Sequence, residues 1–340
     1  MLKILIFLLL INMCIHDFSY AEIHFTHPDI VATQSCYRGP FESYSSWMQM
    51  LKKMNQRKAK TPEALEKRMS RLQTLFSKSS FDNYKVSLEC ITFKYKVDGV
   101  FVDGYLIKPK NQENLPVLIY NRGGNGRYGA VVFGAMLNNL FPVAEQGFAI
   151  IGSQYRGAFD DDVKPGEYDE FGGADVDDVL KLMDFIPNIE NVDVSRIGMY
   201  GSSRGGMQTF LALQHMPNVK AVASVMGASD LLKELENRAE MEKVYKIRIP
   251  NYDTNKAAEL EKRSVLKWAD KLNKSVPILL QHGDEDKKVN VANAIWLDKV
   301  LTKLAHPHKL SIYKGEGHGW SSETKPLAIK ELTDWFHEYL

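Results

Sequence analysis

The hydrophobic pattern divides the chain into a helical N-terminal part and a longer part in which short apolar runs alternate with helical stretches. Between residues 41 and 78, apolar residues recur at helical spacing, and Thr61-Pro62-Glu63 has the cap, proline and acid of a helix start. From Val86 onward the pattern changes to β-rich runs, and Asp98-Gly99, which separates the first two, is typical of a hairpin. We therefore predict a helical extension over residues 22–82.

Further apolar runs follow the predicted hairpin, and longer helical stretches separate them. The runs are residues 115–120, 148–153, 196–200, 219–226, 276–281 and 309–313. Short apolar strands spaced by helices are typical of a parallel sheet that is covered on both faces. For residues 83–340 we predict an α/β fold with a mostly parallel sheet, flanked by helices, whose opening hairpin is the antiparallel edge. The polar, helical residues 230–273 are predicted to form an insertion over the edge of the sheet where ligands bind.

Composition is that of an ordinary globular protein and excludes disordered and fibrous classes, with 44% hydrophobic and 25% charged residues. The net charge of +1 argues against a nucleic-acid partner. The basic residues 52, 53, 57, 58 and 60 are predicted to form a solvated helical surface. We expect no metal, because the three cysteines form no C-x-x-C pair and the aspartates at 160–162 and 175–178 lack calcium-loop spacing.

The first residues have the features of a secretory signal peptide. Lys3 precedes an apolar segment of about 12 residues, which is shorter than the roughly 20 that a membrane-spanning helix needs. Ser19-Tyr20-Ala21 offers small residues at a cleavage site, so we expect residues 1–21 to be removed. The protein would then be exported, periplasmic or secreted, without a stable membrane anchor; an uncleaved anchor is the alternative. In an oxidising compartment Cys36 and Cys90 form either a disulfide or two unpaired thiols.

The strongest chemical signal is Gly201-Ser202-Ser203-Arg204-Gly205, which stands between a predicted strand and a predicted helix. This is the context of a nucleophile elbow, a turn so sharp that side chains two positions from the central serine would collide. Glycine at both positions removes that collision and leaves the hydroxyl of Ser203 exposed above the sheet. Ser203 is therefore the predicted nucleophile, and it requires a base and a carboxylate that holds the base.

Two later loops carry candidates for the acid and the base, in the order that a nucleophile elbow requires. The loop His282-Gly283-Asp284-Glu285-Asp286 offers three carboxylates, and Gly317-His318-Gly319 presents a histidine between glycines. Both loops follow predicted strands, so we expect them to meet at the serine. His282 precedes the carboxylates and breaks the order; it is predicted to be structural, which leaves His318 as the base.

Residues from about 97 to the C-terminus resemble the catalytic domain of the prolyl oligopeptidase family of α/β-hydrolases. The resemblance rests on Tyr155-Arg156-Gly157, Gly201-Ser202-Ser203-Arg204-Gly205-Gly206, His282-Gly283-Asp284-Glu285-Asp286 and Gly317-His318-Gly319. It implies the α/β-hydrolase fold, with Ser203 as nucleophile and His318 as general base. Asp286 is the implied acid, because the family places its acid three residues after the glycine of His-Gly.

An oxyanion hole needs two hydrogen-bond donors, and we expect both from the backbone. One is the N–H of Arg204, and the other is that of Gly124 in the glycine turn after residues 115–120. The family often has His-Gly-Gly-Pro or a tyrosine with glycines at this turn, and a tyrosine donor here would require Tyr120 or Tyr128 to bend in. Arg156 is predicted to form a structural ion pair rather than a substrate site.

Three functions remain open at this point. The first is a serine peptidase that cleaves short peptides or amides through an acyl-enzyme; the second is a carboxylesterase or other acyl hydrolase with the same triad. The third is an inactive binding protein on the hydrolase scaffold. None needs a metal or an organic cofactor, and the expected partner is a small peptide or an acyl ester. Larger relatives carry a β-propeller before the hydrolase domain, which residues 22–82 are too short to form.

Overall fold

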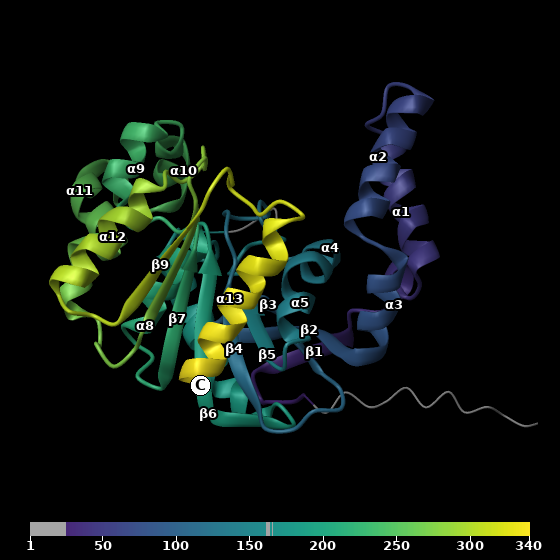
Figure 1. The fold of residues 1–340 in the computed structure, drawn as a ribbon, viewed down its shortest axis with the longest axis horizontal. Coiled ribbons are helices and arrows are strands. Elements are labelled where there is room, and N and C mark those ends of the chain that lie inside the picture. Colours follow the sequence, from purple (N-terminus) through teal and green to yellow (C-terminus); the bar gives the residue numbers. More distant parts are fainter. Residues whose placement is uncertain (1–24, 161–163, 165) are drawn as a thin grey trace, which may run out of the picture.

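The computed structural model describes residues 25–160, 164 and 166–340, so the expected signal peptide lies outside the described residues. A nine-stranded sheet in the order β1-β2-β3-β5-β4-β6-β7-β8-β9 crosses the molecule (Figure 1). Its strands are β1 Ile30–Ser35, β2 Leu88–Val97, β3 Val100–Pro109, β4 Leu115–Asn121, β5 Ala149–Ser153, β6 Val192–Ser202, β7 Val219–Val225, β8 Ile278–Gly283 and β9 His308–Tyr313. Strands β1, β2, β3 and β5 pair antiparallel, and all pairs from β5–β4 to β8–β9 are parallel. The predicted α/β-hydrolase fold with a mostly parallel sheet is confirmed.

Helices cover both faces of the sheet. They are α1 Tyr44–Gln56, α2 Pro62–Leu75, α3 Lys78–Ser87, α4 Phe133–Ala135, α5 Phe141–Ala144, α6 Asp175–Leu180, α7 Leu182–Phe185, α8 Arg204–Leu213, α9 Leu231–Asn237, α10 Met241–Arg248, α11 Tyr252–Lys262, α12 Ala292–Lys303 and α13 Thr324–Tyr339. Successive residues of a strand point to opposite faces, and accordingly Ile119 of β4 joins one hydrophobic cluster while its neighbour Leu118 joins the other. Burial on both faces explains why the central strands are apolar along their whole length.

The N-terminal part differs from the helical extension predicted over residues 22–82, because it begins with a strand. β1 pairs antiparallel with β2 and takes the edge position, and α3 delays the start of β2 to Leu88. Only its first three residues, Ile30, Val31 and Ala32, are apolar, and none of its six residues is buried, so β1 lacks the alternating or continuous apolar pattern by which strands are detected. A disulfide between Cys36 and Cys90 joins the end of β1 to β2. Closing a loop of 54 residues stabilises the fold by about 4 kcal/mol on the chain-entropy model.

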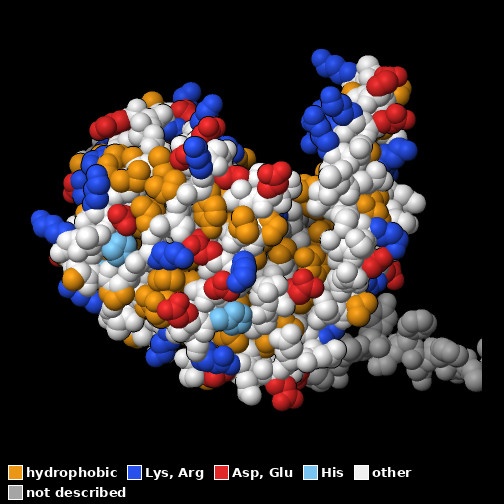
Figure 2. All heavy atoms as spheres, viewed as in Figure 1, with side chains coloured by type: hydrophobic (Ala, Val, Ile, Leu, Met, Phe, Trp, Pro, Cys, Tyr) orange, Lys and Arg blue, Asp and Glu red, His pale blue; other side chains and the backbone are white. Residues whose placement is uncertain are grey.

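Helices α1 and α2 form an arm that rises away from the body (Figure 1). At its base, Trp47 packs against Phe76, Phe81 and Phe133 with ring centroids 4.9 to 5.9 Å apart. Helix α2 buries no residue, and Lys and Arg side chains gather on the exposed arm, as Figure 2 shows. Thr61 caps α2 by accepting the N–H of Ala64, as its position in the sequence predicts. None of the helices in the described ranges is both long enough and apolar enough to cross a bilayer.

Candidate active site

Ser203 occupies the turn between β6 and α8. Its backbone has φ 59° and ψ −125°, a conformation that is strained for a residue with a side chain, and its N–H donates to the Val225 carbonyl of β7 at 2.9 Å. A Cβ atom at position 201 would collide with the Gly205 carbonyl, and one at position 205 would collide with the Asn121 carbonyl of β4. Both glycines are therefore required, the second because the start of α8 packs directly onto β4.

The predicted nucleophile, base and acid lie together above the sheet. Nε2 of His318 is 2.9 Å from Oγ of Ser203, and Nδ1 of His318 is 2.7 Å from Oδ2 of Asp286. An ionised carboxylate can only accept, so Nδ1–H of the neutral imidazole donates to Asp286, and Nε2 accepts from the serine hydroxyl. The hydroxyl proton of Ser203 therefore already points to a base.

The environment of Asp286 keeps it ionised. Its buried Oδ1 accepts the backbone N–H groups of Lys288 at 2.8 Å and Val289 at 3.0 Å. Burial raises the pKa of Asp286, but hydrogen bonds from His282, His318 and Val289 outweigh burial and hold the pKa well below its usual range. His282 also lies 2.9 Å from the Val289 carbonyl, and its Nε2 is 3.4 Å from Oδ2 of Asp286, so it supports the loop of the acid.

Asp284 and Glu285, the other carboxylates of this loop, have different partners. Asp284 accepts the backbone N–H of Gly315 at 2.6 Å, and the N–H of Glu285 donates to the Glu316 carbonyl at 2.9 Å. These contacts fasten the loop after β8 to the loop that carries His318. Among the three candidates, only Asp286 forms a hydrogen bond with the imidazole of His318.

The two predicted oxyanion donors belong to the start of α8 and to the glycine turn after β4. Arg204 is the first residue of α8, where an N–H has no acceptor within the helix. Gly124 adopts φ +74° and lines the same cavity as Ser203 and His318. Gly123, which the sequence analysis did not select, lies even nearer: a Cβ atom there would be 3.1 Å from Cβ of Ser203. Tyr128, one of the two tyrosines considered above as an alternative donor, is 68% exposed.

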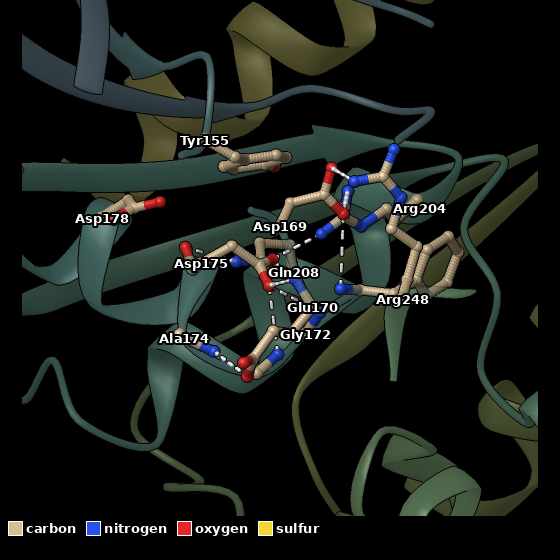
Figure 3. A network of polar contacts seen from close by, with 12 residues as sticks. Tyr155, Asp169, Glu170, Gly172, Ala174, Asp175, Asp178, Arg204, Gln208 and Arg248 are labelled. Atoms are coloured by element: carbon tan, nitrogen blue, oxygen red, sulfur yellow. Dashed lines mark hydrogen bonds and ion pairs between the residues drawn. The ribbon is translucent and has the colours of Figure 1, made fainter. Parts of the chain in front are cut away.

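The side chain of Arg204 is buried beneath the elbow in a network of polar contacts (Figure 3). Its guanidinium pairs with Asp169 at 3.0 Å and with Asp175, and it donates to the Gly124 carbonyl at 2.9 Å. The rings of Tyr155 and Phe171 lie 4.8 and 4.6 Å from its Cζ atom. Arg204 therefore joins the start of α8 to the glycine turn, a role that the sequence analysis did not predict.

A second buried arginine, Arg122, holds the glycine turn and also contacts the ring of Tyr155. Arg122 donates to the carbonyls of Gly126 at 2.8 Å, Gly123 at 3.1 Å and Gln154, and its Cζ lies 4.7 Å from the Tyr155 ring. Backbone carbonyls thus occupy its donors, and the turn is fixed in one conformation. Burial lowers the pKa of Arg122, and the nearby Tyr155 and Asp169 compensate for it only in part.

Arg156 forms the structural ion pair that the sequence predicted. Its guanidinium bonds Asp178 at 2.7 and 2.9 Å and Asp98 at 2.9 Å, and so ties β5 to α6 and to the β2–β3 hairpin. The carboxylate of Asp175 also has protein partners, since it accepts the backbone N–H groups of Glu170, Gly172 and Gly173. Over the described residues, no cluster of His, Cys, Asp and Glu has an arrangement suited to a metal ion.

Two cavities meet at Ser203 and His318. The cap cavity, of about 600 Å³, lies beneath the insertion 230–273, here called the cap, and contains the oxyanion groups; its apolar lining is Phe171, Met207, Leu231, Met241, Val244 and Val289. The α13 cavity, of about 390 Å³, lies on the side of α13 and is lined by Tyr120, Asn138, Asn139, Tyr200, Trp320 and Lys325. The predicted insertion therefore forms a wall of the site.

Fold and site together define a serine hydrolase of the α/β-hydrolase class. Residues 135–340 match the prolyl oligopeptidase family, and the chain belongs to that family. It is 26% identical to the uncharacterized peptidase YtmA of Bacillus subtilis, over 77% of this chain and 98% of that protein. It is 27% identical to the uncharacterized peptidase YuxL of the same organism, over 72% of this chain but 38% of YuxL. An acylaminoacyl peptidase structure from Pyrococcus horikoshii is 25% identical, with a TM-score of 0.61 over 75% of this chain and 42% of that chain.

Proposed function

We propose that this protein is a serine peptidase that hydrolyses short peptides or amides through an acyl-enzyme. Ser203 is the nucleophile, His318 the general base, Asp286 the acid that orients it, and the N–H groups of Gly124 and Arg204 form the oxyanion hole. The observation that carries the proposal is the hydrogen-bonded series Asp286–His318–Ser203, with distances of 2.7 and 2.9 Å, at the junction of two cavities.

In the proposed reaction, Oγ of Ser203 attacks the carbonyl carbon while its proton passes to Nε2 of His318. The ionised Asp286 stabilises the imidazolium, and the oxyanion accepts hydrogen bonds from the backbone donors. When the C–N bond breaks, the imidazolium returns the proton to the departing amine and leaves the acyl group on Ser203. Water then takes the place of the amine, is deprotonated by His318, and releases the acid and the free enzyme.

The acyl part of the substrate is proposed to enter the cap cavity. Its lining is mostly apolar, and the oxyanion donors are part of it, so a substrate carbonyl held there is oriented for attack. The Pyrococcus horikoshii relative is an acylaminoacyl peptidase, which suggests N-acylated amino acids and short peptides as the substrates to test first.

We also propose that the protein works in an oxidising compartment after export. The Cys36–Cys90 disulfide supports this, because disulfides persist outside the reducing cytosol. Sequencing of the mature N-terminus from the producing cell tests the proposal. Removal of residues 1–21 is expected, and a protein that retains them would contradict cleavage.

The activity is tested with matched substrates that differ only in the leaving group. N-acetyl-amino acid p-nitroanilides contain an amide, and the corresponding p-nitrophenyl esters contain an ester that needs little protonation of the leaving group. The proposal predicts turnover of both by wild type and by Ser202→Ala, and loss of both in Ser203→Ala. Turnover of the esters alone would instead assign an esterase, and inertness towards both would leave a binding scaffold.

A further inference from the structure

The two cavities at Ser203 differ in the chemistry of their walls. The oxyanion groups Gly124 and Arg204 line the cap cavity and are absent from the lining of the α13 cavity. A substrate carbonyl that reaches the oxyanion hole therefore directs the acyl part towards the cap. The departing group must lie beside His318, which protonates it, and the α13 cavity is the space that continues past His318, Gly319 and Trp320.

Lys325 brings a positive charge to that cavity without a carboxylate to neutralise it. It is half-buried, and none of the ion pairs or side-chain hydrogen bonds found in the described part of the chain involves its ammonium group. Burial alone lowers the pKa of Lys325 to about 8. Lys325 also borders the adjoining groove towards α3.

The position of Lys325 in α13 is unfavourable for a cation. It is the second residue of a helix of 16 residues; the first turn contains no acidic side chain, and Glu323 at the N-cap makes no side-chain capping hydrogen bond. The N-terminal end of a helix carries a partial positive charge, which disfavours Lys and favours an anion. A bound anion would therefore relieve both the unpaired ammonium group and the charge at the helix end.

Two amide side chains also line this cavity. Asn138 donates to the side-chain oxygen of Asn139 at 3.0 Å, and no other hydrogen bond of either amide is found within the described residues. Asn138 and Asn139 come from a π-helical turn, Met136–Leu140, a distortion that is frequent at functional sites. A cation and two amide groups around a cavity of about 390 Å³ suit a small, planar anion such as a carboxylate.

We infer that the α13 cavity is a leaving-group subsite that binds the free C-terminal carboxylate of the departing amino acid or dipeptide, with Lys325 as its ion-pair partner. This inference rests on the proposed peptidase function and adds the substrate class: short peptides with an unblocked C-terminus. Lys325 acts in substrate binding, whereas proton transfer remains with His318.

Matched peptides test this directly, because N-acetyl-Phe-Ala with a free C-terminal acid differs from its C-terminal amide only in the charge that Lys325 would bind. A charge-assisted hydrogen bond contributes about 1.5–3 kcal/mol, so wild type should cleave the acid with a kcat/KM about tenfold or more above that of the amide. Lys325→Met should abolish this preference while turnover of the amide and of a p-nitrophenyl ester is retained, and Lys325→Glu should invert it. Lys330→Met is the matched control, since Lys330 is exposed on the same helix, lies outside the α13 cavity, and pairs with Asp334.

The possible outcomes separate this inference from the proposed function. If wild type cleaves acid and amide equally, or Lys325→Met keeps the preference, the carboxylate subsite is refuted while the peptidase stands; the wild-type comparison decides this even if a variant fails to fold. If wild type hydrolyses neither the peptides nor the ester, the proposed function itself fails, and the subsite fails with it.

Discussion

Replacement of Arg204 by methionine should destabilise the protein and also slow catalysis, and the two effects have different causes that can be measured separately. Methionine retains much of the apolar stem but removes a guanidinium whose side chain is 2% exposed and whose partners Asp169 and Asp175 have fully buried side chains. Loss of one member of a buried ion pair costs about 3–5 kcal/mol, because the remaining charges stay desolvated and unpaired. We expect the free energy of unfolding at pH 8 to fall by about that amount.

The loss should depend on pH in a defined direction. Burial raises the pKa of Asp175, but Arg204 and the backbone N–H groups of Gly172, Glu170 and Gly173 outweigh burial and hold the pKa below its usual value. A carboxyl group with a depressed folded-state pKa stabilises the fold above about pH 3.9, its unfolded value, and this contribution is lost as pH falls. Without Arg204, the effect of burial on Asp175 prevails and its folded-state pKa rises. Protonation of Asp175 at low pH then removes the buried charge and reduces the loss of stability in the variant. The difference in stability between wild type and variant should therefore be smaller at pH 5 than at pH 8.

Catalysis should suffer because Arg204 also holds the Gly124 carbonyl at 2.9 Å and thereby the turn of the oxyanion hole. Urea unfolding at pH 5 and pH 8 measures stability, and turnover of an N-acyl p-nitroanilide measures kcat. Arg156→Met is the matched control, since it also breaks a buried arginine–aspartate pair but makes no contact with the elbow. A stability loss that is equal at both pH values, together with an unchanged kcat, would refute this account of Arg204.

Asp286→Asn should lower kcat by about 10⁴-fold, because His318 loses the carboxylate that fixes its tautomer, whereas Asp284→Asn should be far milder; if steady-state kinetics rank the two variants in reverse, the acid has been misassigned. Reduction of the Cys36–Cys90 disulfide, or its replacement by two serines, should lower the free energy of unfolding by about 4 kcal/mol with little effect on kcat of the folded enzyme. Denaturant titration with and without reductant checks this, and equal midpoints would show that the bridge does not constrain the unfolded chain.

The central sheet was predictable because its strands are buried on both faces and therefore consist mainly of apolar residues. The edge strand β1 was not predictable, because its residues adopt a strand through pairing with β2 and not through a recognisable apolar pattern. The order of Ser203, Asp286 and His318 was readable for a related reason: strand ends fix where their loops meet, and the glycines at 201 and 205 have a local steric cause.

Contacts between distant loops were beyond sequence reasoning. Asp169 and Asp175 stand in a polar stretch about 30 residues before Arg204, and nothing in their spacing marks them as partners of its guanidinium. Lys325 shares a face of α13 with Ala328, Ile329 and Leu332, and only the cavity beside Ser203 shows that this lysine borders the site. Sequence therefore indicated the reacting groups, whereas the residues that position them required the structure.

The most direct test of the central claim is covalent labelling by a fluorophosphonate, which reacts with a serine only when a base and an oxyanion hole activate it. Peptide mass spectrometry of the labelled wild-type protein should place a single modification on Ser203, the residue whose Oγ lies 2.9 Å from Nε2 of His318. Ser203→Ala should be unlabelled, and Ser202→Ala should be labelled as wild type is. Modification of any other residue, or labelling that persists in Ser203→Ala, would contradict the account.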